Sequence, residues 1–239
     1  MRARRSERGA AMLLALMAML LMAALGAVLM LTTASETIIA GVFRTGEGAR
    51  YAAEAAAERV LAELSVPGDW NLLLDGTARS TFVDGPPGGA RTLPDGSTID
   101  LDQQVNMANC QKASSCSIAE MNTATADRPW GVNNPRWKLV AYAPLNALAP
   151  GGSLNSPYYA VVLVGDDPSE TDNDPTRDGS DAANPGSGII TVRAEAFGPR
   201  GVFRAIELTV SRPPGQGKSS DYNDRAQTGV RVLSWREVR

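Results

Sequence analysis

The run AAMLLALMAMLLMAALGAVLML, residues 10–31, contains no charged residue, and Gly26 is its one member that is not apolar. At about 1.5 Å of rise per residue, a helix of this length spans roughly 33 Å, close to the hydrocarbon core of a bilayer at about 30 Å. The preceding MRARRSER carries four Arg and one Glu. The positive-inside rule therefore predicts a single-pass membrane segment with its amino terminus in the cytoplasm and the remainder exported.

A cleaved secretory signal is the competing interpretation of this amino-terminal region. The apolar region of a signal peptide runs about 7–15 residues, which is shorter than residues 10–31. The nearest small-residue pattern, Leu31-Thr32-Thr33-Ala34, lacks the A-x-A spacing of a signal-peptidase site. Both observations favour a segment that stays in the membrane.

The helical pattern continues well beyond the membrane-length run. Apolar residues recur at helical spacing as far as Leu64, charged residues lie between them, and the first Pro is Pro67. This pattern is typical of an amphipathic helix. We therefore expect one helix from Gly9 to Leu64, about 84 Å long, with residues 10–31 as its transmembrane half and residues 32–65 as its amphipathic half.

Residues 66–239 have the pattern of a β-rich domain, with short apolar or alternating runs broken by Gly, Pro, Asn and Asp. An antiparallel sheet packed on the amphipathic half of the long helix buries both apolar faces, so the predicted fold class is α+β. The turn Gly198-Pro199-Arg200-Gly201 predicts a hairpin. The expected strands are Thr98–Val105, Arg136–Tyr142, Tyr158–Val164, Ile189–Phe197, Val202–Ser211 and Val230–Trp235.

Cys110 and Cys116 are the two cysteines of the chain. A zinc site needs more ligands than two Cys without His provide, and a thioredoxin-type motif needs two intervening residues. Because the segment is predicted to be exported, we expect a disulfide. The closed loop is small, so the chain-entropy model gives a stabilisation of about 2.4 kcal/mol.

The segment 166–178, DDPSETDNDPTRD, carries six acids and one Arg. Crowded carboxylates on a loop suit Ca²⁺, and the alternating spacing of Asp172, Asp174 and Asp178 suggests convergence on one ion. The pattern lacks the Gly and the final Glu of an EF-hand loop. The alternative is a solvated, self-repelling insertion, as charge blocks commonly are. The candidate ligands are Asp166, Asp167, Asp172, Asp174 and Asp178.

The composition argues against several large functional classes. The chain has no His, which excludes Ser-His-Asp triads and His-ligated zinc. It also lacks a G-x-S-x-G or P-loop motif, so we expect no enzymatic activity. The net charge of −3 and the pI near 5.1 argue against a nucleic-acid partner.

Three short motifs carry a family resemblance: RGAAMLLAL at residues 8–16, ASETIIAG at 34–41 and RYAAEAA at 50–56. Over about residues 1–65 the chain resembles the PilX-type minor pilins of type IV pilus systems. The resemblance implies a leader, residues 1–9, that a prepilin peptidase removes after Gly9, so that Ala10 becomes the new and often N-methylated terminus. It also implies location in the bacterial inner membrane and later in the pilus.

The resemblance further implies partners: other major and minor pilins, the inner-membrane assembly platform and a tip adhesin. Most pilins carry Glu as the fifth residue after the cleavage site, where this chain has Leu14. A subunit without this acid cannot neutralise a neighbour's buried amino group, which costs free energy in repeated stacking. The departure favours an initiating or tip position.

Two alternatives share parts of this pattern. One is an envelope binding module on an uncleaved anchor, with the acidic loop holding calcium. The other is the tip pseudopilin of a type II secretion system, which has the same assembly mechanism in another machine.

Overall fold

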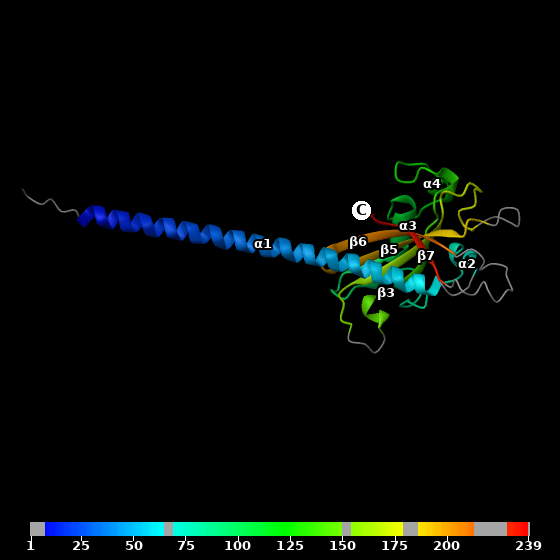
Figure 1. The fold of residues 1–239 in the computed structure, drawn as a ribbon, viewed down its shortest axis with the longest axis horizontal. Coiled ribbons are helices and arrows are strands. Elements are labelled where there is room, and N and C mark those ends of the chain that lie inside the picture. Colours follow the sequence, from blue (N-terminus) through cyan, green and yellow to red (C-terminus); the bar gives the residue numbers. More distant parts are fainter. Residues whose placement is uncertain (1–7, 65–68, 150–153, 179–185, 213–228, 239) are drawn as a thin grey trace, which may run out of the picture. The chain divides into compact units, whose positions relative to one another are not determined.

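The computed structural model describes residues 8–64, 69–149, 154–178, 186–212 and 229–238 (Figure 1). The chain divides into two compact units. Met1–Arg44 is called the anchor unit, and Thr45–Arg239 is called the head unit. Residues 1–7 of the expected leader lie outside the described residues.

The first element is α1, Arg8–Leu64, one helix of 57 residues. It confirms the helix expected from Gly9 to Leu64 and contains a stretch long and apolar enough to cross a membrane. Three threonines follow the apolar run, and each hydroxyl donates to the carbonyl four residues earlier at 2.9 Å. These bonds satisfy Thr32, Thr33 and Thr37 within the helix itself.

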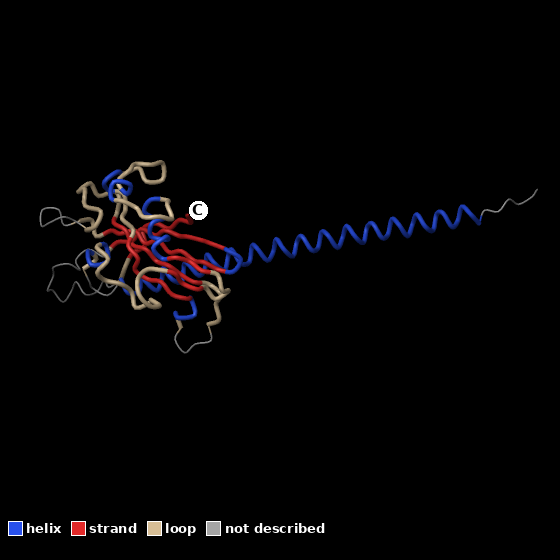
Figure 2. Tube along the Cα trace, turned by 180° about the vertical axis from the view of Figure 1, so that it is seen from behind, coloured by secondary structure: helices blue, strands red, loops and turns tan. Residues whose placement is uncertain are grey.

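The head unit is built on a five-stranded antiparallel sheet with the order β3-β4-β5-β6-β7. Figure 2 shows its strands in red. Every strand pairs with its neighbour in the sequence. The α+β layout and the strands expected in these regions are confirmed, including the hairpin between β5 and β6. The strand bounds are β3 Lys138–Pro144, β4 Tyr159–Asp166, β5 Ile189–Gly198, β6 Val202–Ser211 and β7 Arg231–Val238.

The β5–β6 turn is a short 3-10 segment, Pro199–Gly201. Gly201 has φ 72°, as expected for the glycine of this turn, and Arg200 has φ 61°. β5 and β6 stay in register along their full length, from Ile189 opposite Ser211 to Gly198 opposite Val202.

One face of the sheet packs against the part of α1 that belongs to the head unit (Figure 1). The helix contributes small side chains to this core, and the strands contribute larger branched ones such as Val162, Ile190 and Ile206. Small side chains on the helix let it lie close to the larger side chains of the sheet. Five alanines of α1 have at most 1% of their surface exposed: Ala49, Ala52, Ala53, Ala56 and Ala57.

A second core covers the opposite face of β4 and includes Leu101, Trp137, Tyr159, Val161 and Leu163. All eight residues of β4 are therefore buried. A strand buried on both faces has no polar alternation, which explains the continuous apolar run in its sequence.

The smaller elements correct one expectation. The predicted strand Thr98–Val105 is wrong beyond Asp100, because the chain turns into a helix there. The Asp100 carboxylate caps that helix by accepting from the Gln103 amide at 3.0 Å, which satisfies an amide that has no partner within the helix. The bounds of the smaller helices and strands of the head unit are α2 Asn71–Leu74, β1 Ala90–Thr92, β2 Thr98–Asp100, α3 Leu101–Cys110 and α4 Ile118–Met121.

Candidate functional site

The anchor unit presents an apolar helix surface. Its large apolar side chains between residues 12 and 43 each have 50–79% of their surface exposed. The surface extends beyond the membrane-length run, because Ile38, Ile39, Val42 and Phe43 are 62–69% exposed. A surface of this size marks contact with lipid or with protein.

The residues proposed for processing lie at the beginning of this helix. Gly9 and Ala10 are both helical. Leu14, at the position where most pilins carry Glu, is exposed and belongs to the apolar surface. In a chain beginning at Ala10, the uncharged Leu14 would lie one turn into the helix.

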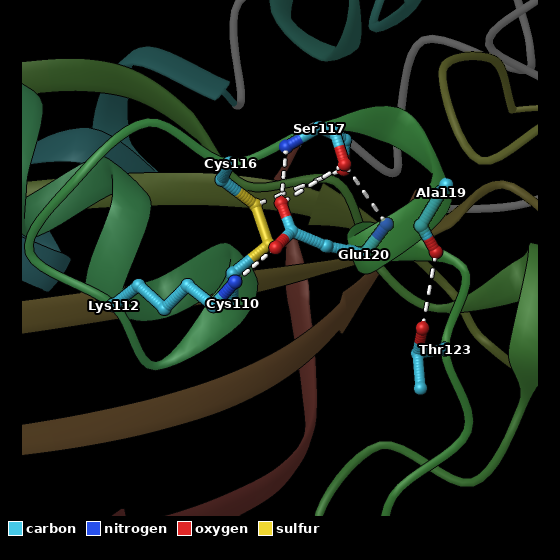
Figure 3. A network of polar contacts seen from close by, with 7 residues as sticks. All are labelled: Cys110, Lys112, Cys116, Ser117, Ala119, Glu120 and Thr123. Atoms are coloured by element: carbon cyan, nitrogen blue, oxygen red, sulfur yellow. Dashed lines mark hydrogen bonds and ion pairs between the residues drawn. A yellow bond between two sulfur atoms is a disulfide. The ribbon is translucent and has the colours of Figure 1, made fainter.

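The two cysteines form the expected disulfide, with their Cα atoms 6.0 Å apart (Figure 3). The bond joins the end of α3 to the residue before the α4 N-cap. Ser117 caps α4 by accepting from the Glu120 amide, and the Glu120 carboxylate accepts from Ser117 N at 2.9 Å. Lys112 pairs with Glu120 across the loop. The disulfide, the capping bonds and the ion pair together fix a surface loop.

The hydrogen bond from Lys112 and those from Ser117 lower the pKa of Glu120 to about 2. The carboxylate therefore stays charged over the physiological pH range, which suits its place in the first turn of α4.

A second cluster of interest forms where β4 ends. Asp166 is the last residue of β4 and is 3% exposed. It lies with Glu170 and Asp172 in a group whose carboxylate oxygens, one from each residue, are within 4.8 Å of one another. Burial, and then repulsion from Glu170, raises the pKa of Asp166 to about 8. Crowded buried carboxylates of this kind hold either protons or a cation.

The other candidate ligands have different roles. The Asp167 carboxylate accepts from Ser169, and the Asp174 carboxylate accepts from Thr176. Asp178 accepts from the Gly188 amide at 2.9 Å. None of the three belongs to the group within 4.8 Å.

The expected convergence of Asp172, Asp174 and Asp178 is therefore not what the structure shows. Glu170 takes the third place in the group. Glu170 lies in the same acidic segment, 166–178, but the predicted ligands are chosen from the spacing of the Asp residues, which does not include it.

A groove of about 1110 Å³ lies over the sheet face opposite α1. Its floor is an ion-pair network in which Arg193 contacts Glu195 at 2.7 Å and Glu207 at 3.0 Å. Glu207 also pairs with Arg236 of β7. Arg193 lies directly opposite Glu207, and Glu207 lies directly opposite Arg236, so these ion pairs join β5, β6 and β7 across the sheet.

Comparison of the chain with family models, with curated proteins and with solved structures finds no match.

Proposed function

We propose that this chain is a minor pilin of a type IV pilus, a membrane-anchored prepilin that helps to initiate or cap pilus assembly. One observation carries the proposal: the exposed apolar surface of α1 extends past the length that a bilayer needs. Residues 10–31 already suffice to cross the membrane, yet Ile38, Ile39, Val42 and Phe43 remain exposed beyond them.

An uncleaved anchor gives no reason for this extension. Apolar side chains outside the hydrocarbon core gain free energy by packing against protein, at about 25 cal/mol per Å² buried. Helices of neighbouring pilins are partners of the required shape, because an exposed helix stripe packs well against another helix. The same helix continues into the head unit, where it forms part of the core.

Removal of the charged leader after Gly9 gives the mechanism. While Arg2, Arg4, Arg5 and Arg8 are present, moving the helix out of the bilayer requires taking these charges through hydrocarbon, which is costly. A chain beginning at Ala10 has only its terminal amine there. Leu14 offers no carboxylate to a neighbouring subunit's amine, which favours one place in the filament over repeated stacking.

The partners in this proposal are the major and other minor pilins, the prepilin peptidase, the inner-membrane assembly platform and a tip adhesin that contacts the head unit. The tip pseudopilin of a secretion system has the same mechanism, and an envelope binding module on a plain anchor is the contrasting case.

The first test is processing. The full chain is co-expressed with a prepilin peptidase, and its intact mass is measured after extraction from the membrane. We expect a mature chain beginning at Ala10, and Gly9→Val should abolish this cleavage. Gly26→Val is the matched control, since a Cβ at Gly26 meets no described heavy atom within 4 Å. A known prepilin, expressed with the same peptidase, serves as the reference. The proposal would be overturned if the reference is fully processed and this chain stays uncut, or if this chain begins near Ser35.

The second test addresses the surface that carries the argument. Val42→Ser combined with Phe43→Ser should leave membrane insertion unchanged, because both residues lie outside residues 10–31. In a piliated host, the variant should lose co-purification with the other pilins. Unchanged co-purification would show that the extension serves another purpose.

A further inference from the structure

We propose that Asp166, Glu170 and Asp172 bind one divalent cation, Ca²⁺, at the end of β4. This site is independent of the proposed pilin function and uses a different set of residues from those that the sequence spacing suggested. Its physical basis is the separation, burial and hydrogen bonding of the three carboxylates.

The separation fits a single ion. Calcium binds oxygen at 2.3–2.6 Å, so two ligands of one ion are at most about 5 Å apart. One oxygen from each of the three residues falls within 4.8 Å of the others. Calcium takes six to eight oxygens, and the loop carbonyls and water would supply those that three carboxylates do not.

The second observation is a buried acceptor without a partner. Asp166 is 3% exposed, and its Oδ1 has no hydrogen-bond partner among the described residues. In the same group, Glu170 Oε2 and Asp172 Oδ2 are also buried and unpartnered in the described structure. Buried polar atoms nearly always have a partner, so three orphaned carboxylate oxygens in one group point to a ligand.

The remaining oxygens of the loop residues hold the carboxylates in place. Glu170 Oε1 accepts from the Ser187 amide at 2.6 Å, and Asp172 Oδ1 accepts from the Asp174 amide at 2.9 Å. Each of these two carboxylates thus uses one oxygen to fix its orientation and leaves the other for a ligand. Such preorganisation is typical of metal sites, where bonds outside the coordination sphere orient the ligands.

Alternative partners do not account for all three oxygens. Arg212 pairs with Asp178 at 3.5 Å, and its guanidinium carbon lies 4.3 Å from the centroid of the Trp70 ring. A proton on Asp166 could be donated to one neighbouring carboxylate only, so at least one of the three oxygens would stay without a partner. A divalent cation satisfies all three at once and cancels most of their charge.

Calcium is favoured over magnesium by the ligands and their setting. The donors are hard oxygens on an irregular loop, which suits the flexible geometry of Ca²⁺. Mg²⁺ requires near-ideal octahedral geometry and gives up its water reluctantly. A bound ion would connect the end of β4 to the loop that precedes β5, because Glu170 also contacts Ser187.

The experiment uses the full chain in detergent after treatment with a chelator, and it measures calcium binding by calorimetry and the thermal midpoint. We expect one Ca²⁺ per chain with a Kd of about 10⁻⁴–10⁻³ M, the range of extracellular calcium modules. At 10 mM Ca²⁺ the midpoint should rise by about 3–10 °C. Mg²⁺ at the same concentration should give a smaller rise.

Variants separate the assigned ligands from their neighbours. Asp172→Asn and Glu170→Gln should each abolish the calcium-dependent rise, whereas Asp174→Asn should keep it. Asp166→Asn removes one of the three carboxylates, so its thermal midpoint should not respond to calcium.

Two results would overturn the site: no heat and no shift with 10 mM Ca²⁺ in the unmodified chain, or loss of binding in Asp174→Asn with retention in Asp172→Asn. Processing at Gly9 is measured separately, so failure of the cation site leaves the proposed function untouched.

Discussion

Replacing Gly48 by alanine tests how closely α1 approaches the sheet. A Cβ at this position would lie 2.2 Å from the hydroxyl oxygen of Tyr158 and 2.9 Å from its Cζ. The same hydroxyl donates to the Thr45 carbonyl at 3.0 Å, one turn earlier on α1. The Tyr158 ring must therefore move, and this hydrogen bond is lost with it.

The size of the effect follows from three opposing contributions. Alanine in place of glycine stabilises a helix by about 1 kcal/mol. Loss of the hydrogen bond costs about 0.5–1.5 kcal/mol, and displacement of a packed ring costs about 1–3 kcal/mol. We expect a net loss of about 2 kcal/mol in the free energy of unfolding, which lowers the midpoint of a domain of this size by about 4–8 °C.

The assay is thermal unfolding of the full chain in detergent, followed by near-ultraviolet circular dichroism of the head unit. Gly41→Ala is the control, since a Cβ there meets no described heavy atom within 4 Å, and it should not lower the midpoint. In a Tyr158→Phe background, Gly48→Ala should cost less, because the nearest clashing atom and the hydrogen bond are already gone. A Gly48→Ala midpoint at or above that of the unmodified chain would refute the close approach.

Three further predictions concern the head unit. Serine at both Cys110 and Cys116 should lower the free energy of unfolding in urea by about 2 kcal/mol, with intact far-ultraviolet dichroism; an unchanged value would contradict the loop-closure argument. Arg193→Ala leaves the buried Glu195 without an ion pair and Glu207 with Arg236 alone, and should cost about 3–5 kcal/mol in the same assay, whereas Arg236→Ala, on a side chain that is 66% exposed, should cost less. The stabilisation linked to Glu120 is present above pH 4.5 and lost as the pH falls through about 2, because its folded pKa is lowered; a carboxyl chemical shift titrating near pH 4 would contradict this.

Much of the fold could be predicted from the sequence because the decisive patterns are local. The uncharged run and the helical spacing up to Leu64 predict α1, and the structure places its two ends within one residue of the expected ones. The turn at Gly198–Gly201 predicts the β5–β6 hairpin, because a Pro followed by a Gly favours that backbone path.

Other features depend on contacts between distant parts of the chain. Alternation over Thr98–Val105 is compatible with a strand, and only the buried position of Leu101 together with the Asp100 cap shows why a helix begins there. The acidic block predicts a site of some kind, but its spacing does not identify Glu170. That residue joins Asp166 because the chain after β4 folds back and Ser187 holds its carboxylate.

The consecutive order of β3 to β7 has a consequence for biogenesis. From β4 onward, each strand pairs with the strand made just before it, so the sheet can grow stepwise during synthesis. Each pairing in this sheet can form as soon as its second strand has been made, because no strand is inserted between two earlier ones. The sheet can therefore be completed in the order in which its strands are synthesised.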